Sequence, residues 1–277
     1  MPWFCANVIW QPSLSSVNNC TQLKELVMAT TQARGEMGRL NAIRLLAFSM
    51  LLIFPGPSRA QESIPIAQQI AKAYGLDSFG QIETIRYTWN VELGDLKLSH
   101  KWEWSPKTDT VSYEGKDKEG KEVKATYRRS ELGSQSDAIK NVIDPAFAND
   151  QYWFILPFHF VWDGPTATDE GMQKPPTGDA SARRVVMKYP SEGGYQPGDT
   201  WDLYVGADKR IEAIVYHRGA PNPPPKLVIA TYTDYKKAGP LLVSTDHRGT
   251  ADGKPLRLTI TDVSVKLTGS DNWINAQ

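Results

Sequence analysis

The side chains best suited to chemistry in this chain are four histidines that lie far apart: His100, His159, His217 and His247. No two of them have the spacing of metal ligands, and the chain has no G-x-S-x-G elbow, phosphate-binding glycine loop or S-x-x-K motif. His100 alternates with apolar residues, so a satisfied core or cavity histidine is a better interpretation there than a general base. We therefore expect no catalytic residue, no metal and no cofactor.

Carboxylates close to an aromatic segment are the remaining candidates for acid–base chemistry. Three of them flank residues 152–162 (YWFILPFHFVW): Asp144, Asp150 and Asp163. Paired acids act at defined separations, which sequence alone does not give. A hydrolase would need His100 or His159 within hydrogen-bond reach of a serine or a carboxylate in a cleft.

Aromatic density is the strongest chemical feature of the chain after residue 60. Seven tryptophans lie there: Trp89, Trp102, Trp104, Trp153, Trp162, Trp201 and Trp273. Such residues fill the core of a β protein that has no disulfides. They also line grooves that hold apolar ligands. The sequence alone leaves both interpretations open.

A long β-hairpin at 84–105 presents many of these aromatic residues on one face. Apolar or aromatic side chains recur at every second position on both sides of Gly94-Asp95: Ile85, Tyr87, Trp89, Val91 and Leu93, then Leu96, Leu98, His100, Trp102 and Trp104. A period of two is typical of a half-buried strand, and a two-residue turn with glycine first suits a type II′ hairpin. The predicted register pairs Trp89 with His100, and Glu92 with Lys97 on the opposite face.

The remaining pattern predicts a mainly β (α+β) domain with about ten strands and two helical segments. One helix covers 64–74 and ends at Gly75, and a second begins at Asp144-Pro145 within 137–153. We expect residues 164–179 to form a polar loop. Besides the hairpin, the expected strands are 110–114, 122–128, 184–189, 200–205, 211–217, 227–235, 241–247, 256–260 and 262–267.

The layout of residues 37–60 is typical of a secretory signal peptide. Basic Arg39 and Arg44 precede the apolar run 45–54, a Pro-Gly-Pro break follows, and small residues lead to a cleavage site near Ala60. Ten apolar residues are too few to span a bilayer. We predict export to the periplasm of a Gram-negative-type bacterium and a soluble mature protein; the alternative is a buried helix of the folded domain.

Residues 1–36 show no clear period, so we expect a non-native or disordered leader, with translation starting at Met28 or Met37; a cytoplasmic leader is the alternative. The mature domain would cover 61–277. Residues 1–60 hold five of the 31 basic and two of the 31 acidic residues, which leaves 26 and 29. A mildly acidic domain lacks the excess of basic residues that is typical of nucleic-acid binding. Because Cys5 and Cys20 precede the signal, the mature chain has no disulfide.

Three segments, taken in order, carry a family resemblance. After the helix and hairpin, Trp102, Trp104, Pro106 and Tyr113 form a W-x-W-x-P-x6-Y arrangement. Residues 150–158 have a YW-L-x-PF form, in which a helix passes into a strand, and 198–205 read G-D-x-W-x-L-Y-V. The chain thus resembles the LolA/LolB-like superfamily of periplasmic lipoprotein carriers.

The resemblance implies a single curved antiparallel sheet that forms an incomplete β-barrel, with helices packed in its open mouth and an apolar cavity between them. It also implies binding rather than catalysis, as in outer membrane lipoprotein sorting. One departure is that the arginine that latches the helical lid in LolA carriers is replaced by Ser105. The protruding apolar loop of LolB has no clear counterpart either.

From these features we predict an exported, non-enzymatic, monomeric protein that holds a lipid or a lipoprotein acyl chain, with a membrane-associated donor or acceptor. The expected ligand-binding residues are Tyr87, Trp89, Leu98, Trp102, Trp104, Trp153, Leu156 and Phe158. The alternative is a protein-interaction or envelope-sensor module on the same fold, with a core filled by its own side chains. An open apolar pocket beneath the helices would favour carriage, and a closed core would favour the interaction module.

Overall fold

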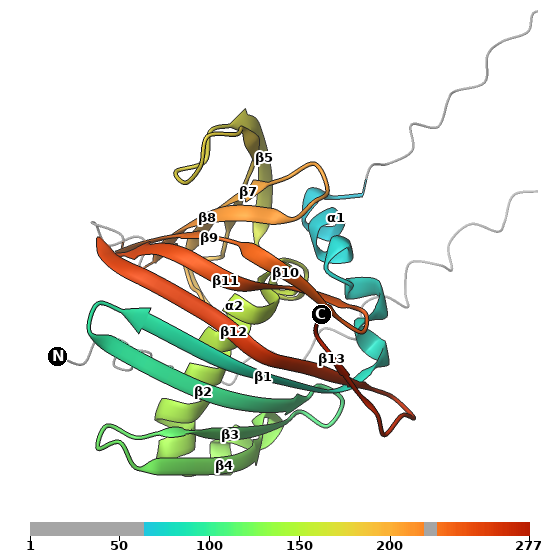
Figure 1. Ribbon diagram of the computed structural model, residues 1–277, viewed down its shortest axis with the longest axis vertical. Coiled ribbons are helices and arrows are strands. Elements are labelled where there is room, and N and C mark those ends of the chain that lie inside the picture. Colours follow the sequence, from blue (N-terminus) through green and yellow to red (C-terminus); the bar gives the residue numbers. More distant parts are fainter. Residues whose placement is uncertain (1–63, 219–225) are drawn as a thin grey trace, which may run out of the picture. The chain divides into compact units, whose positions relative to one another are not determined.

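The computed structural model describes residues 64–218 and 226–277, and every structural statement below concerns this part of the chain. The predicted leader (1–36) and signal peptide (37–60) lie outside the described residues. Thirteen antiparallel strands form one sheet, in the order β4-β3-β2-β1-β12-β11-β9-β8-β7-β6-β5, with β10 paired to β11 and β13 to β12 (Figure 1). The two edge strands, β4 and β5, are not paired with each other, so the sheet does not close. The predicted fold class, a mainly β incomplete barrel, is confirmed.

The elements have these bounds. The helices are α1 (Ile66–Ala73) and α2 (Asp144–Trp162), with short helical turns η1 (Leu76–Gln81), η2 (Arg129–Ser134) and η3 (Ile139–Ile143). The first strands are β1 (Ile82–Leu93), β2 (Leu96–Ser105), β3 (Thr110–Lys116), β4 (Glu122–Arg128), β5 (Thr166–Gln173) and β6 (Ala182–Lys188). The later strands are β7 (Thr200–Val205), β8 (Ile211–Arg218), β9 (Lys226–Thr231), β10 (Thr233–Ala238), β11 (Leu241–Ala251), β12 (Lys254–Leu267) and β13 (Trp273–Asn275).

The β1–β2 hairpin has the predicted register throughout. Trp89 lies opposite His100 and Leu93 opposite Leu96, and Gly94 adopts a φ of +56° in the turn. The opposite-charge pair Lys97–Glu92 forms at 3.4 Å on the outer face. The alternation therefore sets which side chains point into the fold, because a strand places successive residues on opposite faces.

Helix α2 corrects the predicted helix-to-strand transition at 150–158. It begins at Asp144-Pro145 as expected but continues to Trp162, and fourteen of its nineteen residues are buried. Periodicity cannot separate a buried helix from a buried strand when apolar residues are continuous. The helix is interrupted at Ile155 (φ −130°, ψ 35°), two residues before Pro157. Proline has no backbone N–H, so it cannot donate a helical hydrogen bond.

Several strand boundaries also differ from prediction. The expected loop at 164–179 contains the edge strand β5, and the expected strand at 227–235 is divided into β9 and β10. The two strands predicted at 256–260 and 262–267 are one strand, β12, with an irregular register against β1 near Asp262. Asp262 has a φ of +54°, so a bulge replaces the predicted break.

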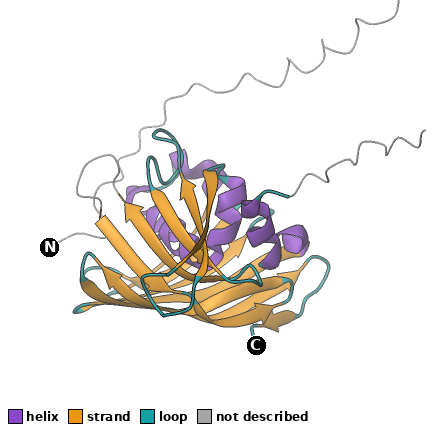
Figure 2. Ribbon diagram, turned by 90° about the horizontal axis from the view of Figure 1, so that it is seen from above, coloured by secondary structure: helices purple, strands orange, loops and turns teal. Residues whose placement is uncertain are grey.

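The helices lie against the concave side of the curved sheet (Figure 2). Helix α1 ends where predicted, with Gly75 at a φ of +101°; a Cβ there would lie 2.1 Å from the Pro240 carbonyl oxygen, so only glycine allows this approach. Leu242 donates its amide to the Tyr74 carbonyl at 3.1 Å. These contacts join the end of α1 to the β10–β11 turn.

Candidate functional site

The predicted ligand-binding residues of the hairpin lie on the face of β1 and β2 that α2 covers. Tyr87, Trp89, Trp102 and Trp104 are buried, and Leu98 is partly buried. The Tyr87 ring stacks on Phe154 with centroids 4.2 Å apart. The structure therefore brings these five residues together against α2, as an aromatic wall formed by two strands.

The predicted residues of α2 divide between two sides of the helix. Trp153, Leu156 and Phe158 are all buried. Phe158 contacts Phe79 of η1 at 5.3 Å between ring centroids, whereas Trp153 contacts His247 of β11 at 5.5 Å. Phe147, which the sequence analysis did not assign, meets both Trp102 (5.2 Å) and Trp104 (5.9 Å). Trp153 thus belongs to a different part of the interior from the hairpin wall.

Several buried aromatic polar atoms have no hydrogen-bond partner among the described residues, among them Tyr87 Oη, Trp89 Nε1, Trp104 Nε1 and Tyr232 Oη. Burial raises the pKa of the Tyr87 and Tyr232 hydroxyls well above the ordinary value, so both are neutral donors. A buried polar group that makes no hydrogen bond costs about 1–3 kcal/mol. The inner face therefore offers unused donors alongside its apolar surface.

A buried carboxylate ties the middle of α2 to strand β2. Asp150 Oδ2 lies 2.7 Å from His100 Nδ1 and accepts the Trp102 indole N–H at 2.8 Å. Asn149 donates to the other carboxylate oxygen at 3.0 Å. Burial raises the pKa of Asp150, although the hydrogen bonds and the charge of His100 oppose this shift. His100 is thus held as a core histidine, as its place in the hairpin predicts.

A second buried carboxylate ties the start of α2 to strand β4. Asp144 Oδ1 accepts hydrogen bonds from Tyr127 Oη at 3.0 Å and from Arg129 Nε at 2.8 Å. Arg129 also donates to the Tyr195 hydroxyl. Burial, together with the charge of Asp144, raises the pKa of Tyr127. An acid at this position also suits the positive end of the helix dipole.

The other side of α2 packs mainly through rings. Tyr152 stacks on His159 at 3.9 Å between centroids, and Trp153 contacts Tyr232 at 6.3 Å. Burial lowers the pKa of His247 to about 4, so this ring is neutral at pH 7. Asp163, which follows the helix, lies 3.0 Å from His159 Nδ1 and is partly exposed.

Both histidines named for a possible hydrolase therefore lie beside a carboxylate. The hydrogen bonds of His100 and His159 in the described structure include no serine or threonine hydroxyl that could act as a nucleophile. Neither histidine lines the two pockets described below. The His100–Asp150 pair joins strand β2 to α2, whereas the His159–Asp163 pair lies between α2 and the residue that follows it.

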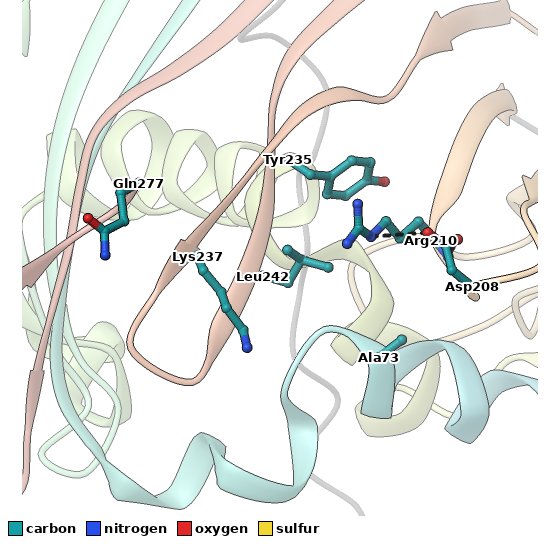
Figure 3. Close-up of a pocket in the computed structure, with 7 residues that line it drawn as sticks. All are labelled: Ala73, Asp208, Arg210, Tyr235, Lys237, Leu242 and Gln277. Atoms are coloured by element: carbon teal, nitrogen blue, oxygen red, sulfur yellow. Dashed lines mark hydrogen bonds and ion pairs between the residues drawn. The ribbon is translucent and has the colours of Figure 1, made fainter.

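Two pockets of the described structure are set apart from the predicted ligand-binding residues, none of which lines them. One has a volume of about 470 Å³ and lies between the end of α1, the β7–β8 turn and strand β10 (Figure 3). We call it the basic pocket; it is lined by Ala73, Asp208, Arg210, Tyr235, Lys237, Leu242 and Gln277. The other, of about 580 Å³, is a polar groove over β10, β12 and β13.

Within residues 64–218 and 226–277, no cluster of three or more histidine, cysteine, aspartate or glutamate side chains could hold a metal ion. None of the helices in these ranges has the length and apolar character needed to cross a bilayer.

Sequence reasoning missed the partners of the acids and the basic pocket. Asp144 and Asp150 were recognised as flanking carboxylates, but their partners come from strands that are distant in sequence. The residues of the basic pocket come from five separate parts of the chain and have no common motif. Ser105 donates its hydroxyl to the Glu83 carbonyl at 2.8 Å and so joins the end of β2 to the start of β1.

Comparison with known proteins gives similarity to solved structures only. No protein-family model and no curated protein matches the chain. Among solved structures, it is similar to a DUF1329 family protein from Desulfovibrio piger, with 11% sequence identity and a TM-score of 0.41. That alignment covers 76% of this chain and 96% of the other.

Proposed function

We propose that this protein is an exported, non-enzymatic, periplasmic carrier that binds a lipid or an acyl chain between its curved sheet and helix α2. The motifs that resemble the LolA/LolB-like superfamily support this proposal, as does the incomplete barrel. The observation that carries it is the inner face itself, where an aromatic wall contains buried hydroxyl and indole donors with no partner. Such donors suit the ester or carboxyl oxygens of an otherwise apolar ligand.

Binding in this way requires α2 to move, because its side chains occupy the concave face. The break at Ile155, next to Pro157, divides the helix into two segments that could separate there. An acyl chain would replace the contacts of Phe147 and Phe154 with the wall. Each buried methylene contributes about 0.8 kcal/mol, so a long chain offsets the loss of several ring contacts.

A second candidate function is favoured by the same packing. The rings of Phe147 and Phe154 fill the space over β1 and β2, as expected for an interaction or envelope-sensor module with a closed core. Such a module would bind a protein through an exposed sheet edge. Strand β5 is one such edge, and its Met172 is 63% exposed.

The two functions are separated by purifying the protein without detergent and analysing its organic extract by mass spectrometry. Carriage predicts co-purifying lipid and saturable binding of a fluorescent fatty acid that is weakened by Trp89→Phe and Trp104→Phe. The matched control is Trp201→Phe, because the Trp201 indole is already bonded to Gln196. No lipid and no saturable binding would contradict carriage and favour the interaction module.

A further inference from the structure

The basic pocket combines charges with apolar surface in a way that the aromatic wall does not. Arg210 follows the β7–β8 turn, and Lys237 lies on β10, close to the last described residue, Gln277 (Figure 3). Reciprocal backbone hydrogen bonds of 2.9 and 3.2 Å join Lys237 to Gln277. The side chains in this hollow therefore come from parts of the chain that are fixed relative to one another.

The sheet register explains why these side chains share one face. Lys237 pairs with Leu242 across β10 and β11, and directly opposite residues of an antiparallel pair point to the same side. Tyr235 is two positions from Lys237 along the strand and so points the same way. Ala73, in the last turn of α1, completes the apolar wall together with Leu242.

The floor of the pocket is rigid, and its hydroxyl groups are already used. The Tyr235 and Tyr74 hydroxyls lie 2.6 Å apart, Tyr74 accepts the Ile211 amide at 2.9 Å, and Tyr235 donates to the Ile211 carbonyl at 2.5 Å. Tyr235 thus presents its ring to the pocket, with the Arg210 guanidinium 5.3 Å from the ring centroid. A bound group would meet an aromatic face and would not have to displace these hydrogen bonds.

The charges of the pocket favour an anion. Among the side chains that line it, Arg210 and Lys237 supply two positive charges and Asp208 supplies one negative charge. The Arg210–Asp208 pair is 3.3 Å long with both side chains about half exposed, so it is weak and leaves guanidinium N–H groups free. Lys237 forms no ion pair with any residue of 64–218 or 226–277. Two cations with spare donors are the usual recognition elements for phosphate and carboxylate groups.

We propose that the basic pocket binds a phosphate or carboxylate group, with the adjoining apolar part of the ligand against Ala73, Leu242 and the Tyr235 ring. This inference rests on the proposed function, since the anion would be the headgroup of the carried amphiphile; a free anion offers the same chemistry. A volume of about 470 Å³ accommodates a headgroup and a few carbons rather than a whole lipid.

The test measures calorimetric binding of dodecyl phosphate, dodecanol and inorganic phosphate to the full chain, below the micellar concentration of the amphiphiles. We expect dodecyl phosphate to bind at least ~10-fold more tightly than dodecanol. This preference is expected to weaken with added salt and to disappear in an Arg210→Gln/Lys237→Gln variant. A matched Lys97→Gln/Arg128→Gln variant removes the same charge from β2 and β4 and is expected to keep the preference.

The outcomes separate the pocket from the proposed function. Inorganic phosphate that binds as tightly as dodecyl phosphate, and is lost in the pocket variant, supports the anion site and identifies a free anion as its source. Equal binding of dodecanol and dodecyl phosphate overturns the anion site but leaves the carrier function standing. Phosphate binding that needs Arg210 and Lys237, with no dodecanol binding, overturns the carrier function and keeps the site. Identical binding of every probe by wild type and the pocket variant overturns the proposal, as does no binding of any probe.

Discussion

The two sides of helix α2 are held by different forces. Toward β2 and β4, the buried carboxylates Asp144 and Asp150 accept hydrogen bonds at 2.7 to 3.0 Å from side chains of β2, β4 and the turn η2. Toward β11, Trp153 packs against rings, among them the neutral His247. Rings pack on both sides of the helix, but only the side toward β2 and β4 adds hydrogen bonds to buried carboxylates, so the two sides should respond differently to pH.

The largest expected effect on stability comes from removing a buried carboxylate on the side of α2 that faces β2 and β4. Asp144→Ala leaves the Arg129 guanidinium, which is 18% exposed, without its carboxylate. We expect a loss of about 3–5 kcal/mol in the free energy of unfolding, because an uncompensated buried charge is costly. Urea denaturation measures it. Asp137→Ala, which removes an acid that is 87% exposed, is the control and should cost less than about 0.5 kcal/mol.

The next largest effect is the pH dependence of stability that comes from His247, on the side of α2 that faces β11. The pKa of His247 is about 4 in the folded protein against an ordinary value of 6.5, so the unfolded chain binds more protons between these values. Stability is therefore full above pH 6.5 and falls by about 3 kcal/mol as the pH drops to 4. His247→Gln should flatten this part of the stability profile.

A control for that profile is His217→Gln, whose ring is partly exposed. Because the buried ring of His247 remains in this variant, the acid-induced loss should persist. An equally steep profile in His247→Gln would mean that His247 does not govern the response to acid.

Asp150 is expected to make a smaller contribution to the pH dependence of stability, opposite in sign to that of His247. Burial raises its pKa, so the folded protein binds its proton more tightly than the unfolded chain. This contribution to stability is present at low pH and is lost as the pH rises from 3.8 through the raised value. Asp150→Asn cannot titrate, so its stability relative to wild type should increase over this range. A constant difference between the two proteins across the pH series would contradict the assignment.

The smallest expected effect distinguishes a tyrosine hydroxyl that forms a hydrogen bond from one that does not. Tyr87→Phe removes a buried hydroxyl with no partner and should change the free energy of unfolding by less than about 1 kcal/mol, or increase it. Tyr127→Phe removes the donor to Asp144 and should cost about 1–2 kcal/mol. Equal losses in thermal denaturation would mean that the Tyr87 hydroxyl is bonded in solution.

The hairpin and the helix show how far the sequence could predict this molecule. In 84–105, alternation, turn and charge pairs all indicate one register, and the structure has that register. In 152–162, a nearly continuous apolar run has no period, so the end of the helix was predicted wrongly. The aromatic wall was found because its residues lie on two adjacent strands. The contact of Phe147 with this wall was not predicted, because it depends on tertiary packing that no local pattern encodes. The same holds for the meeting of Arg210 and Lys237 in one pocket.

The central claim, that an apolar ligand enters between α2 and the sheet, is tested most directly by hydrogen exchange. Amide exchange in α2, β1 and β2 would be measured while a long-chain fatty acid is titrated into the full protein. We predict saturable changes in these three elements, with the largest where Phe147 and Phe154 contact the hairpin. Exchange that stays unchanged in α2 and the hairpin up to millimolar ligand would contradict the account.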